Sequence, residues 1–215
     1  LRTEHLVIAT GSRPQALSAL PFGGDILSST EALSLRQVPG RLAIVGGGYI
    51  AVEFANISHG LGVETMLVYR GKEILGRFAG DRWRGLHEAM EAKGIRILCQ
   101  DIFEAVDKRT DGRYDVRLKS GNTMAFDQVM LSLGRIPNTE ELGLEAAGVK
   151  TGVRGEILVD AYSRTNVENI WAIGDVTDRV QLTPVAIHEA MCFVETVFKG
   201  NPTKVDHQDI ATAVF

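Results

Sequence analysis

The feature that most constrains the fold of this chain is a short apolar run that leads directly into three glycines. Residues 42–45 are long enough for one buried parallel strand. Gly46, Gly48 and Ala51 then follow in the order Gly-x-Gly-x-x-Ala. In a strand–turn–helix unit the first glycine permits the tight turn, the second lets the backbone approach a pyrophosphate, and the small third residue keeps helix and strand close. The pattern predicts a dinucleotide-binding turn, although a tight loop in another kind of α/β protein can have the same residues.

A helical pattern begins directly after the glycines. Ile50, Phe54 and Ile57 recur at helical spacing, which predicts that they form one apolar face of the helix. The helix would begin where the turn ends. Its free N–H groups and its dipole would therefore favour the negative charge of a pyrophosphate.

The next apolar segment indicates which nucleotide is expected. Residues 64–70 read as a second strand about 20 residues after the first glycine, where an NAD site carries an acidic residue for the ribose 2′-hydroxyl. This strand instead ends in Arg70, with Lys72 close behind. A guanidinium binds a 2′-phosphate through two hydrogen bonds, whereas a carboxylate would repel it. We therefore expect NADPH rather than NADH.

The middle of the chain completes an α/β fold with an antiparallel part. An amphipathic helix is expected at 81–93, with Gly94 at its C-terminal end. Turn dipeptides between alternating runs predict an antiparallel β-meander, and a solid apolar strand follows it. The expected strands are 95–99, 103–106, 114–118, 124–126 and 127–133. The fold class is a Rossmann-like parallel sheet flanked by helices, with this meander added.

The two ends of the chain carry further elements. Residues 6–9 read as a buried strand, and Ser28 with Glu31 predicts a capped helix start. Residues 169–175 read as a buried strand that ends on Gly174 and Asp175. This carboxylate is suited either to binding a ribose or polyol hydroxyl or to capping the next turn. Thr183 is placed to cap a following helix over 185–198.

Composition excludes several other classes of protein. The chain has 215 residues, 45% of them hydrophobic, and a formal net charge of −4, which argues against nucleic acid as a partner. No apolar run approaches the roughly 18–20 residues that span a membrane, and no signal-peptide pattern is present.

Cys99 and Cys192 belong to no metal-spaced set, and we expect Cys99 to be a buried hydrophobe. Free thiols fit a reducing, cytoplasmic location. The apolar ends suggest a piece of a longer protein.

Three motifs in fixed order carry a resemblance to a known family. They are Ala9-Thr-Gly11, Gly46-Gly-Gly-Tyr-Ile-Ala-Val-Glu53 and Ala172-Ile-Gly-Asp175. Together they resemble the flavin-dependent pyridine nucleotide–disulfide oxidoreductases. Tyr69-Arg70 and Leu182-Thr-Pro-Val-Ala-Ile-His-Glu-Ala190 look like the glutathione reductase branch, with trypanothione reductase close behind. The resemblance covers essentially the whole chain.

The resemblance implies a split FAD domain with an NADPH domain inserted in it. Residues 1–20 would end the first part of the FAD domain, 21–135 would be the NADPH domain, and 136–215 would belong to the second part of the FAD domain. Tyr49 would cover the nicotinamide pocket, and Glu53 would accept a hydrogen bond from the carboxamide. These two are the implied catalytic residues. The implied cofactor-binding positions are Thr10, Gly11, Gly46, Gly48, Tyr49, Ile50, Ala51, Glu53, Arg70, Lys72, Arg77, Gly134, Arg135, Gly174, Asp175, Leu182 and Thr183.

Each implied role has a plainer alternative. Tyr49 could simply pack at the helix start, Glu53 could be a solvated carboxylate, and Asp175 could cap a turn.

In one place the sequence also departs from the glutathione reductase branch, which has a second phosphate-binding arginine in a Leu-Arg-x-Phe-Asp segment. Gly76 stands there, and Arg77 follows one place late. Loss of one charged hydrogen bond would cost about 1.5–3 kcal/mol, so we expect weaker NADPH binding.

In this family the reaction needs parts that these 215 residues do not contain. The resemblance puts the redox Cys-x-x-x-x-Cys segment and the FAD pyrophosphate turn ahead of residue 1, and the His–Glu pair after residue 215. It implies a homodimeric parent that passes electrons from NADPH through FAD to glutathione disulfide. We expect the piece alone to bind NADPH, with an incomplete FAD site and no turnover. Two alternatives stay open: an NAD-dependent relative such as a dihydrolipoamide dehydrogenase or NADH oxidase, and a nucleotide-binding module without redox activity.

Overall fold

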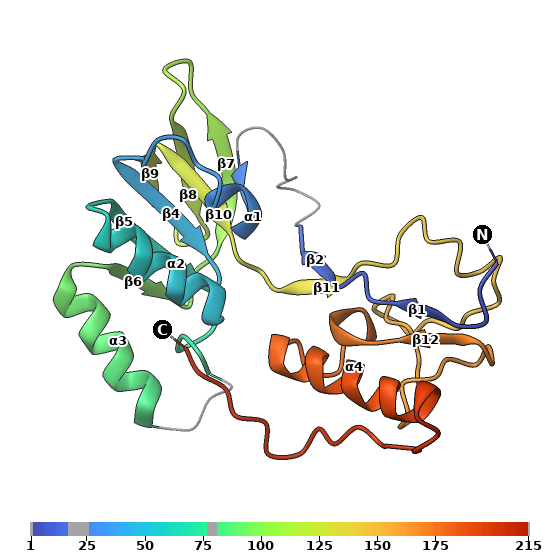
Figure 1. Cartoon of the computed structure of the whole chain (residues 1–215). Coiled ribbons are helices and arrows are strands. Elements are labelled where there is room, and N and C mark those ends of the chain that lie inside the picture. Colours follow the sequence, from blue (N-terminus) through green and yellow to red (C-terminus); the bar gives the residue numbers. More distant parts are fainter. Residues whose placement is uncertain (1, 17–25, 77–80, 215) are drawn as a thin grey trace. The chain divides into compact units, whose positions relative to one another are not determined.

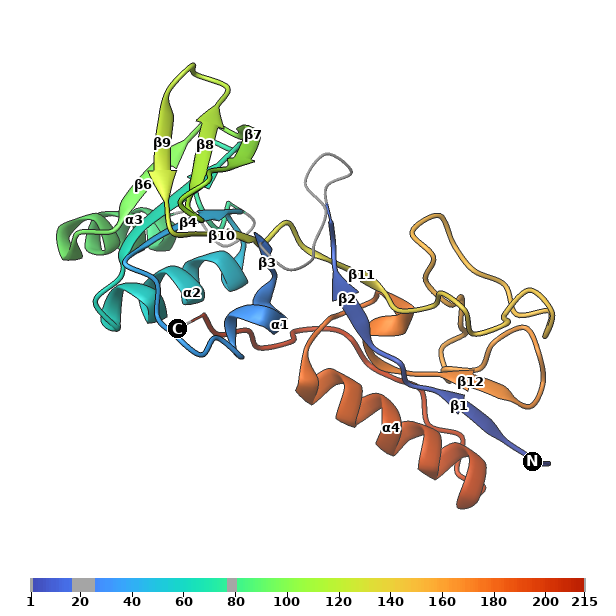
Figure 2. The same ribbon diagram turned by 90° about the horizontal axis from the view of Figure 1, so that it is seen from above.

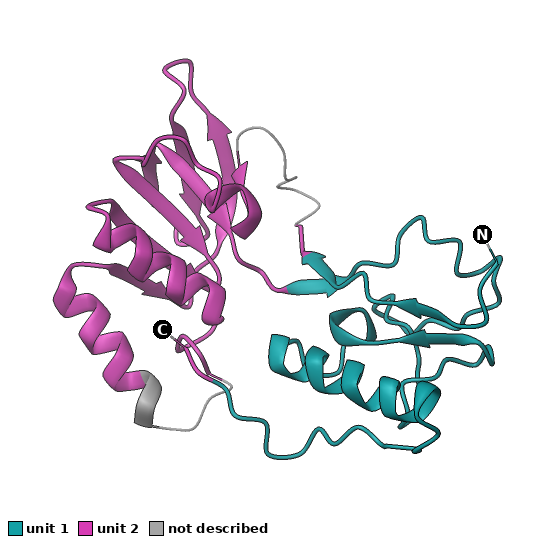
Figure 3. Cartoon of the chain, viewed as in Figure 1, with its two compact units in different colours: residues 1–13, 135–212 teal, residues 14–134, 213–215 magenta. Residues whose placement is uncertain are grey.

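The computed structural model describes residues 2–16, 26–76 and 81–214, without the side chains of residues 81–83. They form two compact units, shown in different colours in Figure 3. One unit comprises residues 1–13 and 135–212, and the other comprises residues 14–134 and 213–215. The predicted domain boundary at residue 20 and the predicted ligand Arg77 fall outside the described residues.

The larger unit is built on a five-stranded parallel sheet. Its strand order is β3-β10-β4-β5-β6, so the central strand β4 is hydrogen-bonded on both edges. The register aligns Val45 of β4 with Val68 of β5 and with Leu131 of β10. The strands are β3 (Ile26–Leu27), β4 (Arg41–Val45), β5 (Glu64–Tyr69), β6 (Arg96–Cys99) and β10 (Gln128–Leu131). The predicted α/β fold with a parallel sheet is confirmed.

Both faces of this sheet are covered, which explains why β4 is a continuous apolar run. Leu42 and Ile44 face a core shared with helices α2 (Tyr49–Gly60) and α3 (Asp81–Lys93). Ala43 and Val45 face a second core. That core is completed by the antiparallel sheet β7 (Phe103–Lys108), β8 (Tyr114–Leu118) and β9 (Thr123–Phe126). Figures 1 and 2 show the helices and this meander on opposite faces of the parallel sheet.

The buried face of α2 differs from the predicted one. Ile57 is 51% exposed, and Ile50 and Phe54 are only partly buried against the core. The buried residues are the small or short ones: Ala51, Val52, Ala55 and Ser58. The glycine turn brings the helix so close to the sheet that large side chains do not fit between them.

Two predicted helix ends are confirmed in detail. Helix α1 (Ser29–Ala32) begins in a capping box, in which Ser28 Oγ accepts from Thr30 N–H and Glu31 accepts from the Ser28 backbone N–H. Helix α3 ends at Lys93, and Gly94 follows it with a φ of +106°, in the left-handed region that favours glycine.

The smaller unit contains two pairs of short strands and one long helix. β1 (Leu6–Ile8) pairs in parallel with β12 (Ile170–Ala172), and β2 (Ser12–Pro14) pairs with β11 (Arg135–Pro137). A 3₁₀ turn, η1 (Gly174–Thr177), follows β12, and helix α4 (Thr183–Phe198) follows the turn. Trp171 of β12 meets Phe193 of α4 edge to face, with ring centroids 5.2 Å apart.

Three local predictions need correction. β1 is a strand, but Leu6 and Val7 are 42% and 38% exposed because only Ile8 reaches the core of this unit. Thr183 does not cap α4: the N-cap is Leu182, and Thr183 is the first helical residue. Cys99 is partly exposed rather than buried, since β6 is the edge strand of its sheet.

Candidate functional site

The glycine turn lies where the carboxyl ends of β4 and β10 meet. Gly46 has a φ of +145°, and a Cβ there would lie 2.2 Å from the carbonyl oxygen of Ser132. Its N–H donates to Val68 O, while Ser132 N–H donates to Val45 O. β4 has β5 on one side and β10 on the other, so the order in which the chain adds strands to the sheet reverses at β4. Ligands of open parallel sheets bind at such a point.

The middle glycine of the triplet has a packing role that we did not predict. A Cβ at Gly47 would lie 2.4 Å from the ring of Tyr69, and a Cβ at Gly71 would also lie 2.4 Å from it. The ring of Tyr69 is therefore packed against two stretches of bare backbone. Gly47 O also accepts a hydrogen bond from Leu75 N–H at 2.7 Å, which ties the glycine turn to the loop after β5.

The start of α2 is open to an anion. Gly48 is the N-cap residue, and no side chain caps the helix there. A Cβ at Gly48 would meet nothing within 4 Å, so there is free space next to the first N–H groups. Tyr49 is 37% exposed at the helix start, Ile50 and Glu53 are half-buried, and Ala51 is fully buried. Uncapped N–H groups and a positive helix dipole are suited to a pyrophosphate.

Two cations lie after the neighbouring strand. Arg70 and Lys72 are exposed, and neither forms an ion pair with another described residue. Because β4 and β5 are paired in parallel, their carboxyl ends lie at the same edge of the sheet, close to the glycine turn. Gly76 is exposed in the same loop. The structure thus brings the predicted turn and the predicted phosphate-binding cations together.

In the other unit, the Ala-Thr-Gly segment is joined to the segment around Asn138. Thr10 Oγ1 donates to Asn138 O at 2.7 Å, and Asn138 N–H donates to Gly11 O at 2.9 Å. Gly11 has a φ of +72°, which accounts for glycine at this position. Gly134 belongs to the larger unit, at the end of the segment that follows β10.

Ser12 connects two of the predicted site residues. Its hydroxyl donates to Asp175 Oδ2 at 2.6 Å and accepts from Arg135 Nε at 2.7 Å. Arg135 also donates through Nη2 to Ser12 O at 2.5 Å. No sequence motif indicates Ser12, because its partners are far away along the chain. Asp175 Oδ1 accepts no hydrogen bond from the described residues, so it can accept one from a ligand hydroxyl.

The turn that carries Asp175 lies against the start of α4. Gly174 has a φ of +73°, and a Cβ there would lie 3.3 Å from the Ala186 Cβ. Leu182 and Thr183 form the start of α4, which has no side-chain cap, and Thr183 is exposed. This part of the unit therefore offers a carboxylate oxygen and an uncapped helix start, which suit a polyol chain and an electron-rich ring edge.

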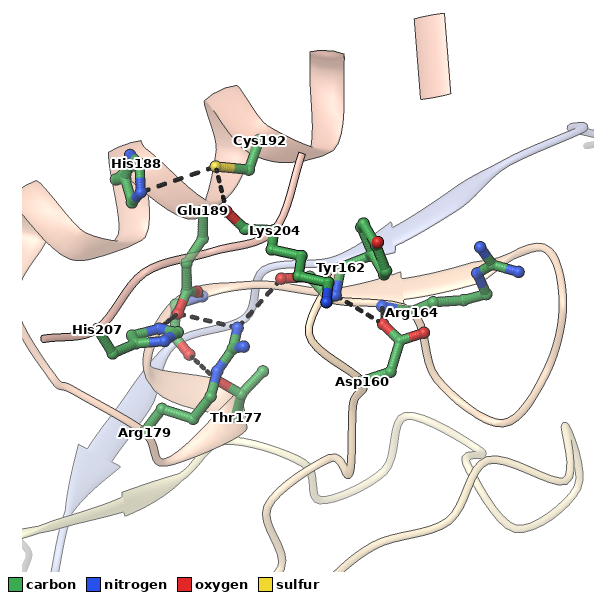
Figure 4. Close-up of polar contacts among 12 residues, drawn as sticks. Asp160, Tyr162, Arg164, Thr177, Arg179, His188, Glu189, Cys192, Lys204 and His207 are labelled. Atoms are coloured by element: carbon green, nitrogen blue, oxygen red, sulfur yellow. Dashed lines mark hydrogen bonds and ion pairs between the residues drawn. The ribbon is translucent and has the colours of Figure 1, made fainter. Parts of the chain in front are cut away.

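A buried charge cluster lies behind this turn (Figure 4). Glu189 of α4 is 1% exposed, forms an ion pair with Arg179 Nη2 at 2.9 Å and accepts a hydrogen bond from His207 Nε2 at 2.8 Å. Its other oxygen accepts from Gly174 N–H at 2.5 Å. Sequence reasoning missed this cluster as well.

Neither cysteine has the surroundings of a reactive thiolate. Burial raises the pKa of the Cys99 thiol and also of the Cys192 thiol, and nearby carboxylates add to both shifts. Among the residues that the structure describes, no group of three His, Cys, Asp or Glu side chains is placed to hold a metal ion. Among the helices of the described residues, none is long and apolar enough to cross a membrane.

Comparison with known proteins adds to this geometry. Residues 1–190 match the family described as "Pyridine nucleotide-disulphide oxidoreductase". Trypanothione reductase of Leishmania donovani is 46% identical over 219 residues, which cover 100% of this chain and 44% of that protein. The chloroplastic/mitochondrial glutathione reductase of Pisum sativum is 41% identical over 212 residues, covering 99% of this chain and 38% of that protein.

A solved structure is similar over the same extent. The HOCl-induced flavoprotein disulfide reductase RclA from Escherichia coli matches with a TM-score of 0.92 at 26% identity. The match covers 99% of this chain and 49% of that one. The chain therefore spans less than half the length of each of these three proteins.

Proposed function

Because this chain belongs to the pyridine nucleotide–disulphide oxidoreductase family, we propose that it forms the NADPH-binding part and a portion of the FAD-binding part of a disulfide reductase. Proteins of this family use FAD and NAD(P)H, as predicted from the sequence. In the proposed reaction NADPH supplies a hydride to the flavin, which passes two electrons on to a redox disulfide and then to a disulfide substrate.

The observation that carries the NADPH assignment is the presence of two cations, without ion-pair partners among the described residues, beside an uncapped helix start. In the proposed site, the N–H groups at the start of α2 hold the pyrophosphate, with Gly48 leaving room for it. Arg70 and Lys72 bind the 2′-phosphate. Glu53 orients the nicotinamide through its carboxamide, and Tyr49 covers the ring. An NAD-specific protein would need an acidic side chain near the end of this strand, where Tyr69 and Arg70 stand.

The residues proposed to hold FAD lie in the smaller unit. Asp175 binds a ribityl hydroxyl through its open Oδ1, while Ser12 holds Oδ2 in place. Thr183 and the uncapped start of α4 approach the pyrimidine edge of the flavin. Thr10, Gly11, Gly174 and Leu182 shape the backbone around these groups.

Glutathione disulfide is the proposed substrate of the full-length protein. Trypanothione disulfide is a second candidate, favoured by the 46% identity to the Leishmania enzyme. We also propose that a polypeptide of these 215 residues alone has no turnover. Its two cysteines, Cys99 and Cys192, do not have the spacing of a Cys-x-x-x-x-Cys pair.

The proposal is tested by NADPH oxidation in the flavin-loaded full-length protein, with each disulfide offered separately. We expect turnover with glutathione disulfide, and its kcat/KM should exceed that for trypanothione disulfide. Turnover confined to trypanothione disulfide would make that molecule the substrate. NADPH oxidation that depends on neither disulfide would contradict a role in disulfide reduction.

A further inference from the structure

We propose that Glu189 is a positioning residue for FAD: it holds the Gly174–Asp175 turn in place through the Gly174 N–H. The inference rests on the proposed function and extends it, since it concerns how this chain presents Asp175 to the flavin.

The first step in the argument is the burial of this carboxylate. Glu189 is 1% exposed, and among the residues that the structure describes it is the only buried Asp, Glu, Lys, Arg or His. A carboxylate in such a place costs much free energy unless several donors compensate it. An apolar side chain could fill the same volume without that cost. The charge therefore calls for a reason beyond packing.

The second step is the set of groups that compensate the carboxylate, which come from residues 174–179 and from His207. Arg179 Nη2 forms an ion pair with Oε1, His207 Nε2 donates to Oε1, and Gly174 N–H donates to Oε2. Figure 4 shows Glu189 reaching from α4 between Arg179 and His207. Arg179 is itself fixed, because Nε donates to Thr177 Oγ1 and Nη2 donates to Ser163 Oγ, both at 3.1 Å. The carboxylate thus has a defined orientation.

The third step concerns the bond to Gly174, which differs from the other two. It fixes the peptide between Ile173 and Gly174, one residue before Asp175, in a turn where Gly174 has a left-handed φ of +73°. The preceding residue is fixed too, since Ile173 N–H donates to Ile8 O at 3.1 Å. The Asp175 side chain is then fixed by Ser12. Backbone and side chain are held by separate bonds, and Oδ1 remains available to a ligand.

The decisive experiment measures FAD affinity in the flavin-loaded full-length protein, using recovery of flavin fluorescence on dilution. Glu189→Gln removes the charge and cannot satisfy Gly174 N–H, Arg179 and His207 together. We expect the dissociation constant for FAD to rise about tenfold or more. The matched control is Glu195→Gln on the same helix, whose carboxylate pairs with Lys199 and not with any group around Glu189. Its FAD affinity should stay within about twofold of the original value.

A double-mutant cycle separates positioning from a general loss of stability. If Glu189 acts through Asp175, the effect of Glu189→Gln should shrink to less than about threefold in an Asp175→Asn background. Effects that simply add, or a Glu189→Gln protein that is less stable but binds FAD normally, would overturn the inference. Failure of the unsubstituted protein to bind FAD would instead overturn the proposed function.

A second variant covers the case in which Glu189→Gln does not fold. Arg179→Met combined with Glu189→Met replaces the charged pair by apolar side chains of similar volume, a change that protein cores often tolerate. This variant keeps the fold but leaves the Gly174 N–H without an acceptor. It should lose FAD affinity to the same extent as Glu189→Gln, and normal affinity in it would contradict the inference.

Discussion

The hydroxyl of Ser12 donates a 2.6 Å hydrogen bond to Asp175 Oδ2, across 163 positions of the chain. The same hydroxyl accepts a hydrogen bond from Arg135, so one small side chain orients a carboxylate and a guanidinium at once. Three segments that are separate in sequence are joined at the turn where we propose that the flavin ribityl chain binds.

Replacement of Ser12 by alanine tests this link. Ser12→Ala leaves Arg135 Nε and Asp175 Oδ2 without their shared partner, so we expect a loss of about 1–3 kcal/mol in the free energy of unfolding. Urea unfolding measures it. Ser34→Ala is the matched control, because Ser34 makes one long, exposed hydrogen bond of 3.4 Å. Its change should stay within about 0.5 kcal/mol, and equal effects of the two substitutions would contradict the role of Ser12.

Gly47 and Gly48 are adjacent but should respond differently to alanine. Gly47→Ala forces a Cβ to 2.4 Å from the Tyr69 ring and should destabilise the fold by about 1–3 kcal/mol. Gly48→Ala meets no atom within 4 Å and should leave stability within about 0.5 kcal/mol. It fills the space proposed for the pyrophosphate, so NADPH affinity should fall about tenfold or more. Calorimetric titration with thermal unfolding checks both, and normal NADPH binding by Gly48→Ala would count against the proposed site.

Gly76 offers a gain-of-affinity test. The nearest atom to a Cβ at this position would be the carbonyl oxygen of Glu73 at 3.4 Å, an ordinary contact, and the backbone is not left-handed. Gly76→Arg should therefore be accommodated and should add a charged hydrogen bond to the 2′-phosphate. We expect NADPH affinity to rise about ten- to a hundredfold while NADH affinity is unchanged. Gly76→Gln controls for side-chain size, and an equal rise with both coenzymes would contradict the account.

The capping box of α1 should make stability depend on acid pH. The hydrogen bond from the Ser28 hydroxyl, opposed by partial burial, lowers the pKa of Glu31 in the folded protein. A lowered folded pKa means that Glu31 stabilises the fold above its unfolded pKa, and that this stability is lost as pH falls through the folded value. Ser28→Ala should raise the pKa of Glu31, measured by NMR titration, and cost about 0.5–2 kcal/mol near neutral pH. An unchanged pKa in the variant would show that Ser28 is not its cause.

The fold was predictable from sequence because its signals are local. The apolar run of β4, the glycines after it and the turn dipeptides of the meander each specify their own backbone geometry. The buried face of α2 was not predictable in the same way. Ala51 and Ala55 are buried because the helix lies close to the sheet, and helical periodicity of large residues carries no information on that distance.

Candidate site residues could be predicted only where a local sequence motif specifies both the residue and its position in the fold. Gly48 and Arg70 could be singled out because a turn and a strand end define their positions. Ser12 and Glu189 could not, since each acquires its role from partners on other segments. Long-range hydrogen bonds of this kind leave no periodic pattern in the sequence.

The measurement that tests the central claim most directly is calorimetric titration of the full-length protein with NADPH and with NADH, before and after Arg70→Met. The account predicts that the unsubstituted protein prefers NADPH, and that the substitution weakens NADPH binding by about ten- to a hundredfold while NADH binding is unchanged. Lys93→Met, on the exposed end of α3, should change neither affinity. Equal affinity for the two coenzymes in the unsubstituted protein, or an equal loss of both in Arg70→Met, would contradict it.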